Sequence, residues 1–281
     1  MLTVENHDRD NAGLTYVYPV LSRRAGGLSI GINLNPNNQC NWRCVYCQVP
    51  DLKRGSAPAI DLQLLAMELR QLLADVLQGD FFERQKVQAE LRNIKDIALS
   101  GNGESTSAFE FDTVILLIGD IMSEFKLVSS IKLVLITNGS FIQRPNVQKG
   151  LQMMAELNGE VWFKVDSATQ DGMKRINSIN RTMNSVITNL DSSCRICPTW
   201  LQTCMFQQNG LSPSTEEQDA YIHFIQQLLK NNTPLKGVLL YGLARPSLQQ
   251  EAAELETLEP EWLESFAERI RALSLPVKIS S

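Results

Sequence analysis

The hydrophobic positions of this chain alternate between two spacings, one typical of β-strands and one typical of α-helices. Residues 28–34 (LSIGINL) form a short β-rich segment with a period near two, and it ends at the turn sequence NPNN. Between 60 and 78, leucines and a valine recur every three or four residues, which predicts a long amphipathic helix. The same change of spacing repeats downstream, with strands predicted at 96–100, 131–136, 161–165, 199–206 and 237–241, and helices at 109–125, 147–157, 216–230 and 261–273.

This alternation yields six βα units and predicts an α/β fold with a mostly parallel sheet. The length of 281 residues lies in the range that one α/β domain fills, and no Gly-, Ser- or Pro-rich linker divides the chain. We therefore predict one domain over 1–281, with an N-terminal extension at about 1–27, a core at about 28–245, and a C-terminal helix and tail at about 246–281. Functional side chains of such a sheet lie in the loops after the strands.

Composition narrows the class of protein further. Hydrophobic residues make up 43% and charged residues 20%, as in folded proteins. The net charge of −5 does not favour long-range attraction of a nucleic acid. The N-terminal sequence MLTVENHDRD lacks the features of a secretion signal, and the apolar runs are too short to span a bilayer. We therefore expect a cytoplasmic protein without a membrane segment, whose six cysteines are thiols or metal ligands.

Three cysteines follow the first predicted strand within eight residues, as Cys40, Cys44 and Cys47 in the spacing C-x3-C-x2-C. Structural zinc usually takes four protein ligands in two pairs, so three thiolates suggest an open catalytic site or an iron–sulfur cluster with one iron left without a protein ligand. Soft thiolate ligands favour the cluster. A molecule with an amine and a carboxylate can chelate the remaining iron. An incidental thiol cluster and a zinc site remain the alternatives.

This motif, with the aromatic Tyr46 just before the last cysteine, resembles the signature of the radical S-adenosyl-L-methionine (SAM) superfamily. The resemblance implies a partial (βα)6 TIM-type barrel that holds a 4Fe-4S cluster on Cys40, Cys44 and Cys47 and binds SAM. The segments LSGNGE, LITNG and YGLAR, after the second, third and sixth predicted strands, are similar to the branch that includes wyosine-type tRNA-modifying enzymes. SAM supplies the amine and the carboxylate that an open iron site requires.

The same resemblance implies roles for residues at the ends of other strands. The segment from Gly101 to Glu104 resembles a Gly-Gly-Glu motif that contacts the amino group of SAM, because glycines admit a ligand to the backbone and a carboxylate accepts hydrogen bonds from an ammonium. Asp166 and Ser167 are expected near the ribose, and Arg181 and Arg245 near a carboxylate or an anionic substrate. The predicted cofactor-binding residues are Tyr46, Gly101, Gly103, Glu104, Asn138, Asp166, Ser167, Arg181 and Arg245.

The activity implied is reductive cleavage of SAM to a 5′-deoxyadenosyl radical, which abstracts hydrogen from a substrate. That substrate is a small molecule, a peptide or a tRNA base, although the acidic charge does not favour tRNA, and the electron donor is a protein such as a flavodoxin or a ferredoxin. The alternative is a non-catalytic iron–sulfur or zinc protein that acts as a sensor or in electron transfer. Cys194, Cys197 and Cys204 are either ligands of a second metal or buried thiols that pack in the core.

Overall fold

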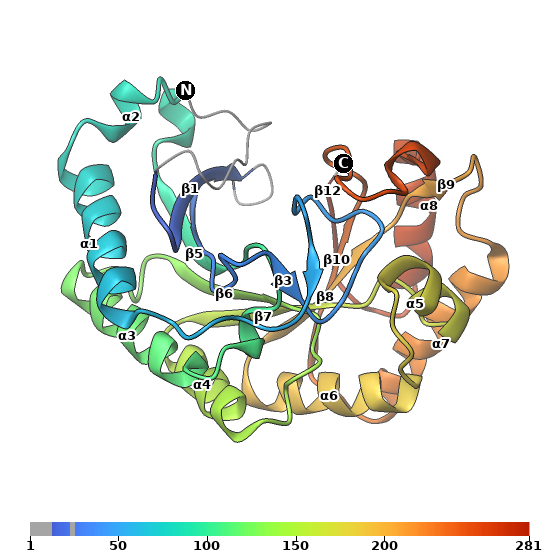
Figure 1. The fold of residues 1–281 in the computed structure, drawn as a ribbon. Helices are drawn as coiled ribbons and strands as arrows, with labels where there is room; N and C mark the ends of the chain where they lie inside the picture. Colours follow the sequence, from blue (N-terminus) through green and yellow to red (C-terminus); the bar gives the residue numbers. More distant parts are fainter. Residues whose placement is uncertain (1–12, 23–25, 281) are drawn as a thin grey trace.

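The computed structural model describes residues 13–22 and 26–280, and its centre is an eight-stranded sheet in the order β1-β2-β5-β6-β7-β8-β10-β12 (Figure 1). The strands β2 to β12 of this sheet pair in parallel, and β1 pairs antiparallel with β2 at one edge. The sheet curls into a half-barrel, which confirms the predicted partial (βα)6 TIM-type fold. Its strands are β1 Val17–Ser22, β2 Gly27–Ile32, β5 Ile94–Leu99, β6 Lys132–Thr137, β7 Gly159–Lys164, β8 Thr199–Cys204, β10 Leu235–Tyr241 and β12 Val277–Ser280.

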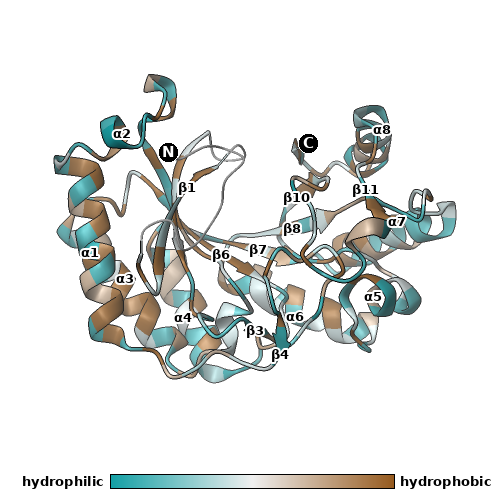
Figure 2. Ribbon diagram, turned by 45° about the horizontal axis from the view of Figure 1, so that its top comes forward, coloured by the Kyte–Doolittle hydropathy of each residue, from teal (hydrophilic) through white to brown (hydrophobic). Residues whose placement is uncertain are grey.

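The long helices cover the outer face of the curled sheet (Figure 1). Buried apolar residues of these helices pack with those of the strands, so the core lies between these two layers. Figure 2 colours the hydrophobic positions of α1 and α3 brown. The helices are α1 Leu62–Gln78, α2 Phe81–Arg84, α3 Phe111–Glu124, α4 Pro145–Glu156, α5 Gln170–Asn177, α6 Met183–Ile196, α7 Thr215–Lys230 and α8 Pro260–Arg271. Two small ribbons, β3 Gln39–Cys40 with β4 Lys53–Arg54 and β9 Gln207–Gln208 with β11 Leu255–Glu256, lie outside the main sheet.

Sequence patterns predicted six of the strands and five of the long helices to within a few residues. Local capping explains some of the boundaries: the Asp61 side chain accepts hydrogen bonds from the N–H groups of residues 63 and 64 where α1 begins, and Ser214 and Glu217 form a capping box at the start of α7. In the described part of the chain, no helix combines the length and hydrophobicity needed to cross a membrane.

Two strands of the main sheet and two of the longer helices were not predicted. Strand β1 lies inside the predicted extension 1–27, of which residues 1–12 and 23–25 are outside the described residues, and it carries Pro19 at the sheet edge, where proline is tolerated. Strand β12 is short and, within residues 13–22 and 26–280, pairs only with β10. Helices α5 and α6 fill the gap between the fourth and fifth predicted strands. The α6 sequence, MNSVITNLDSSCRI, is rich in residues of modest helix propensity, so tertiary packing of its buried face decides the conformation.

Candidate functional site

A cavity of about 960 Å³ lies at the carboxyl ends of the central strands, on the inner side of the half-barrel. This volume is at the upper end of the range typical of cofactor and ligand sites. The loop that carries Cys40, Cys44 and Cys47 forms one part of its wall. Of the residues predicted to bind a cofactor, six line the same cavity: Tyr46, Gly101, Gly103, Glu104, Asn138 and Arg245.

The cysteine loop has little regular structure after Cys40, so its backbone groups require partners elsewhere in the chain. The N–H groups of Arg43 and Val45 donate to carbonyl oxygens at the end of α5, at 3.2 and 2.8 Å. Asn177, also at the end of α5, places its amide nitrogen 3.2 Å from the Cys44 sulfur. Helix α5 therefore fixes the loop from one side, although the sequence pattern gave no sign of this helix.

Burial raises the pKa of the Cys40 and Cys44 thiols to about 12. No disulfide joins any of the six cysteines, all of which lie in the described part of the chain. Within residues 13–22 and 26–280, no group of three or more His, Cys, Asp or Glu side chains converges closely enough to hold a single metal ion. The three thiols thus share one cavity wall without forming a ready-made site for one ion.

The two glycines of the loop after β5 are required by close packing. A Cβ atom on Gly103 would lie 2.0 Å from the backbone oxygen of Gln39, and one on Gly101 would lie 2.4 Å from the side-chain oxygen of Asn33. That Asn33 oxygen accepts a hydrogen bond from the N–H of Asn102 at 3.0 Å. The glycines therefore let this loop lie directly against the segment that leads into Cys40, which brings the two predicted motifs together.

Glu104 is buried and binds the end of the neighbouring strand. Its carboxylate accepts hydrogen bonds from the Thr106 and Thr137 hydroxyls at 2.5 and 2.6 Å and from the Asn138 N–H at 2.7 Å. Burial raises the pKa of Glu104 and these hydrogen bonds oppose the rise, with a net increase. The carboxylate thus ties the loop after β5 to the end of β6 while it remains part of the cavity wall.

Asp166 lies behind the cavity wall and holds Tyr46. It accepts hydrogen bonds from the Tyr46 hydroxyl at 2.5 Å, the Asn177 amide at 2.8 Å and the Cys204 N–H at 3.0 Å. Asp166 is not among the residues that line the cavity. Asp166 therefore lies behind Tyr46 and supports it, and its contact with a ribose stays a prediction.

Lys164, the last residue of β7, faces the cavity and was missed by the sequence analysis. Its ammonium donates to the Tyr241 hydroxyl at 2.9 Å and lies 3.9 Å from Asp166 and 5.0 Å from the centre of the Tyr46 ring. Burial lowers the pKa of Lys164, but the nearby Asp166 and other acidic groups raise it more, so the ammonium is charged at neutral pH. Lys164 is the one charged residue in the predicted strand 161–165, and this was the available signal.

The remaining predicted residues are not among those that line the cavity. The Ser167 hydroxyl accepts the Thr169 N–H at 3.2 Å in the turn before α5, as in a capping turn. The Arg181 guanidinium donates to the Ser140 and Ser185 hydroxyls at 3.4 and 2.9 Å, and burial lowers its pKa. Both side chains therefore make contacts within the protein.

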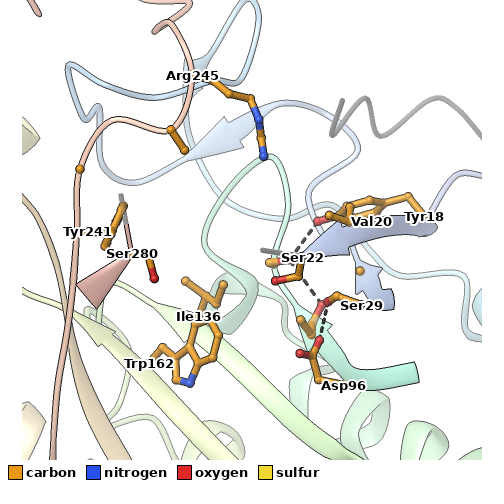
Figure 3. Close-up of a pocket in the computed structure, with 15 residues that line it drawn as sticks. Tyr18, Val20, Ser22, Ser29, Asp96, Ile136, Trp162, Tyr241, Arg245 and Ser280 are labelled. Carbon is orange, nitrogen blue, oxygen red and sulfur yellow. Dashed lines mark hydrogen bonds between the residues drawn. The ribbon is translucent and has the colours of Figure 1, made fainter. Parts of the chain in front are cut away.

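Deeper in the half-barrel, a small pocket of about 140 Å³ adjoins the main cavity and shares Tyr18, Tyr241 and Arg245 with it. Figure 3 shows its hydroxyl-rich wall, in which Ser29 donates a hydrogen bond to Asp96, with the Trp162 ring on the opposite side. Gln202 lines the main cavity, is 2% exposed, and its side-chain oxygen has no hydrogen-bond partner among the described residues. The lumen thus contains polar groups suited to a polar ligand.

The other three cysteines do not converge. Cys194 and Cys197 are buried in the main hydrophobic core, where burial raises the pKa of each thiol to about 12. Cys204 lies in a separate cluster beside Tyr46 and on the cavity wall. This arrangement agrees with the interpretation of these residues as packed thiols.

Sequence comparison finds distant relatives. No protein-family model matches the chain. A protein of Brachyspira hyodysenteriae named GTPase Obg is 24% identical over 266 residues, which cover 92% of this chain and 34% of that protein. A UPF0026 protein of Helicobacter pylori is 24% identical over 216 residues, or 75% of this chain and 61% of the relative. The chain thus spans between about a third and three fifths of these relatives, and it contains no G-x-x-x-x-G-K-[ST] phosphate-binding motif.

Solved structures show the fold. TYW1 with a lysine-pyruvate adduct bound superposes with a TM-score of 0.57 at 13% identity, over 87% of this chain and 73% of that one. SuiB of Streptococcus suis bound to S-adenosylmethionine gives 0.55 at 11% identity, over 91% and 47%. A radical SAM methyltransferase from Sphaerobacter thermophilus gives 0.53 at 13%, over 90% and 66%. The chain therefore has the half-barrel fold of radical SAM enzymes, and the predicted resemblance is confirmed at the level of the fold.

Proposed function

We propose that this chain is a cytoplasmic radical SAM enzyme that binds a 4Fe-4S cluster through Cys40, Cys44 and Cys47. The observation that carries the proposal is the meeting of the C-x3-C-x2-C loop and the Gly101–Glu104 loop on the wall of one cavity. When bound, the cluster supplies the electron that cleaves SAM to methionine and a 5′-deoxyadenosyl radical for hydrogen abstraction. A flavodoxin or a ferredoxin is the kind of protein that would deliver that electron.

The three thiols fit such a cluster. They are soft ligands, they share one loop, and each thiolate of a polynuclear cluster binds a different iron, so they need not converge on one point. Their raised pKa values mean that cluster binding displaces protons from Cys40 and Cys44.

The residues around the thiols suit a ligand with an ammonium, a carboxylate and a nucleoside. The backbone of Gly101–Glu104 is accessible in the cavity, and the Lys164 ammonium offers a positive charge for a carboxylate or for sugar oxygens. The unpartnered Gln202 oxygen supplies a hydrogen-bond acceptor deeper in the lumen. With a volume of about 960 Å³, the cavity has room for SAM and a second small ligand.

The direct test is anaerobic reconstitution with iron and sulfide, followed by SAM and dithionite, with 5′-deoxyadenosine measured by chromatography. A variant with Cys40, Cys44 and Cys47 replaced by alanine removes the proposed ligands. The matched control is Cys194→Ala, because this thiol lies in the core away from the cavity.

Wild-type and control proteins should bind about four irons and produce 5′-deoxyadenosine, whereas the triple variant should do neither. A wild-type protein that binds a cluster but does not cleave SAM would instead indicate a sensor or an electron carrier. A protein that binds no iron would refute the proposal. Copurified tRNA, or a salt-dependent tRNA complex, would favour a tRNA substrate over a small molecule.

A further inference from the structure

The loop that carries the cysteines is held on its second side by a segment about 200 residues later in the chain. This segment, residues 247–251, follows β10 and the cavity-lining residues 242–246, and its own Leu248 also lines the cavity. Its side chains and backbone reach the carbonyl oxygens of the cysteine loop, whereas the end of α5 accepts that loop's N–H groups. The two sets of contacts are complementary because they satisfy different backbone groups of one irregular loop.

The contacts concentrate on Cys47. Its carbonyl oxygen accepts hydrogen bonds from the Leu248 N–H at 3.0 Å and from the Gln249 side-chain amide at 3.2 Å, and the Ser247 hydroxyl lies 3.3 Å away. The Ser247 hydroxyl also donates to the Val45 carbonyl at 2.7 Å. Ser247 is 7% exposed, so these hydrogen bonds are shielded from water.

The same Gln249 amide donates to the Val49 carbonyl at 2.9 Å, and an ion pair closes the end of the segment. Glu251 accepts two hydrogen bonds from the Arg43 guanidinium, at 2.8 and 2.7 Å. The segment thus contacts the loop before Cys44, between Cys44 and Cys47, and after Cys47. The backbone on both sides of Cys44 and of Cys47 is therefore held in a fixed position.

We propose that Ser247 and Gln249 are positioning residues for the metal centre: they hold the carbonyls of Val45, Cys47 and Val49 so that Cys44 and Cys47 are oriented before iron arrives. The inference rests on the proposed function for the identity of the centre. The loop geometry that it predicts exists in the metal-free protein and is measurable there. A loop ordered in advance loses less conformational entropy when the cluster binds, and outer contacts of this kind commonly change metal affinity 10- to 100-fold.

The first test uses the metal-free protein and amide hydrogen exchange. In the double variant Ser247→Ala, Gln249→Leu, the amides of Val45 and Leu248 should exchange at least about tenfold faster than in wild type, because three donated side-chain hydrogen bonds are lost. The matched control is Gln250→Leu, since Gln250 is exposed and its amide contacts only Glu251 among the described residues. Exchange in the core strand β6 should be unchanged in both variants, which shows that they fold.

The second test measures cluster retention. After reconstitution, the double variant should release iron to a chelator about tenfold faster than wild type, and Gln250→Leu should match wild type. Ser247→Thr keeps the hydroxyl and should retain iron better than Ser247→Ala, which a purely steric role would not produce. Equal iron release from the double variant and from wild type would overturn the inference.

The two tests separate failure of this inference from failure of the proposed function. If wild type binds no cluster, the proposed function fails, and faster exchange in the double variant would still establish that the segment orders the loop. If wild type binds a cluster and the double variant exchanges and releases iron at wild-type rates, the proposed function stands and the positioning role is wrong.

Discussion

Replacing Asp166 with asparagine tests whether its carboxylate supports the protein or contacts a ligand. The carboxylate accepts three hydrogen bonds of 2.5 to 3.0 Å from Tyr46, Asn177 and the Cys204 backbone, and its side chain has no exposed surface. The Lys164 ammonium lies 3.9 Å away. Asparagine keeps the shape of the side chain but removes the charge that balances this buried ammonium.

The expected cost follows from these contacts. Removing one partner of a buried ion pair costs about 3–5 kcal/mol. In the variant, Lys164 keeps its hydrogen bond to the Tyr241 hydroxyl, and its side chain is 16% exposed. We therefore expect a loss at the lower end of this range, about 3 kcal/mol in the free energy of unfolding. The matched control Asp171→Asn, at an exposed position in the first turn of α5, should cost less than about 1 kcal/mol.

Urea unfolding of the metal-free variants, followed by far-ultraviolet circular dichroism, measures both values, and SAM binding is measured in parallel. In the double variant Asp166→Asn, Lys164→Met, the loss of unfolding free energy should be smaller than the sum of the two single losses, because each substitution removes the same ion pair. If Asp166→Asn stays within about 1 kcal/mol of wild type yet loses SAM binding, the carboxylate contacts the ligand and our supporting role for it is refuted.

Three further substitutions have clear expectations. Gly103→Ala should greatly weaken SAM binding, measured by equilibrium dialysis, because its Cβ would meet the Gln39 carbonyl at 2.0 Å; wild-type affinity would show that the loop can move. Gln202→Leu should leave the unfolding free energy unchanged or raise it, because its buried oxygen has no partner in the described part of the chain, and it should reduce ligand affinity. A loss of unfolding free energy above about 2 kcal/mol would indicate a structural role. The hydrogen bonds from Arg43 lower the pKa of Glu251, so Glu251→Gln should reduce the free energy of unfolding by about 1 kcal/mol at pH 7. This difference from wild type should vanish as the pH falls through the folded-state pKa of Glu251, because protonation removes the charge in the wild type as well. A difference that persists at pH 3 would contradict the ion pair.

The motifs that follow the central strands could be predicted because local patterns determine them. Each of those strands is a short apolar segment, and parallel pairing then brings the cysteine loop and the Gly101–Glu104 loop to the same edge. The resemblance to radical SAM enzymes rested on the cysteine spacing, and the fold agrees with it.

The contacts that hold these motifs in place could not be predicted, because their partners lie in distant parts of the chain. Asp166 turns toward Tyr46, 120 residues earlier, and the 247–251 segment reaches a loop about 200 residues earlier. A strand-end aspartate looks the same in sequence whether it faces a cavity or a neighbouring side chain. Helix α6 is also decided by packing, since its own residues have modest helix propensity.

The half-barrel leaves two sheet edges, and unpaired edges invite association with other chains. Strand β1 at one edge contains Pro19, which has no N–H to donate to an added strand. Strand β12 at the other edge is four residues long. Within the described residues, the missing N–H of Pro19 and the shortness of β12 both reduce the hydrogen bonds available to an incoming strand, and so they oppose strand addition at the two edges beside the open-sided lumen.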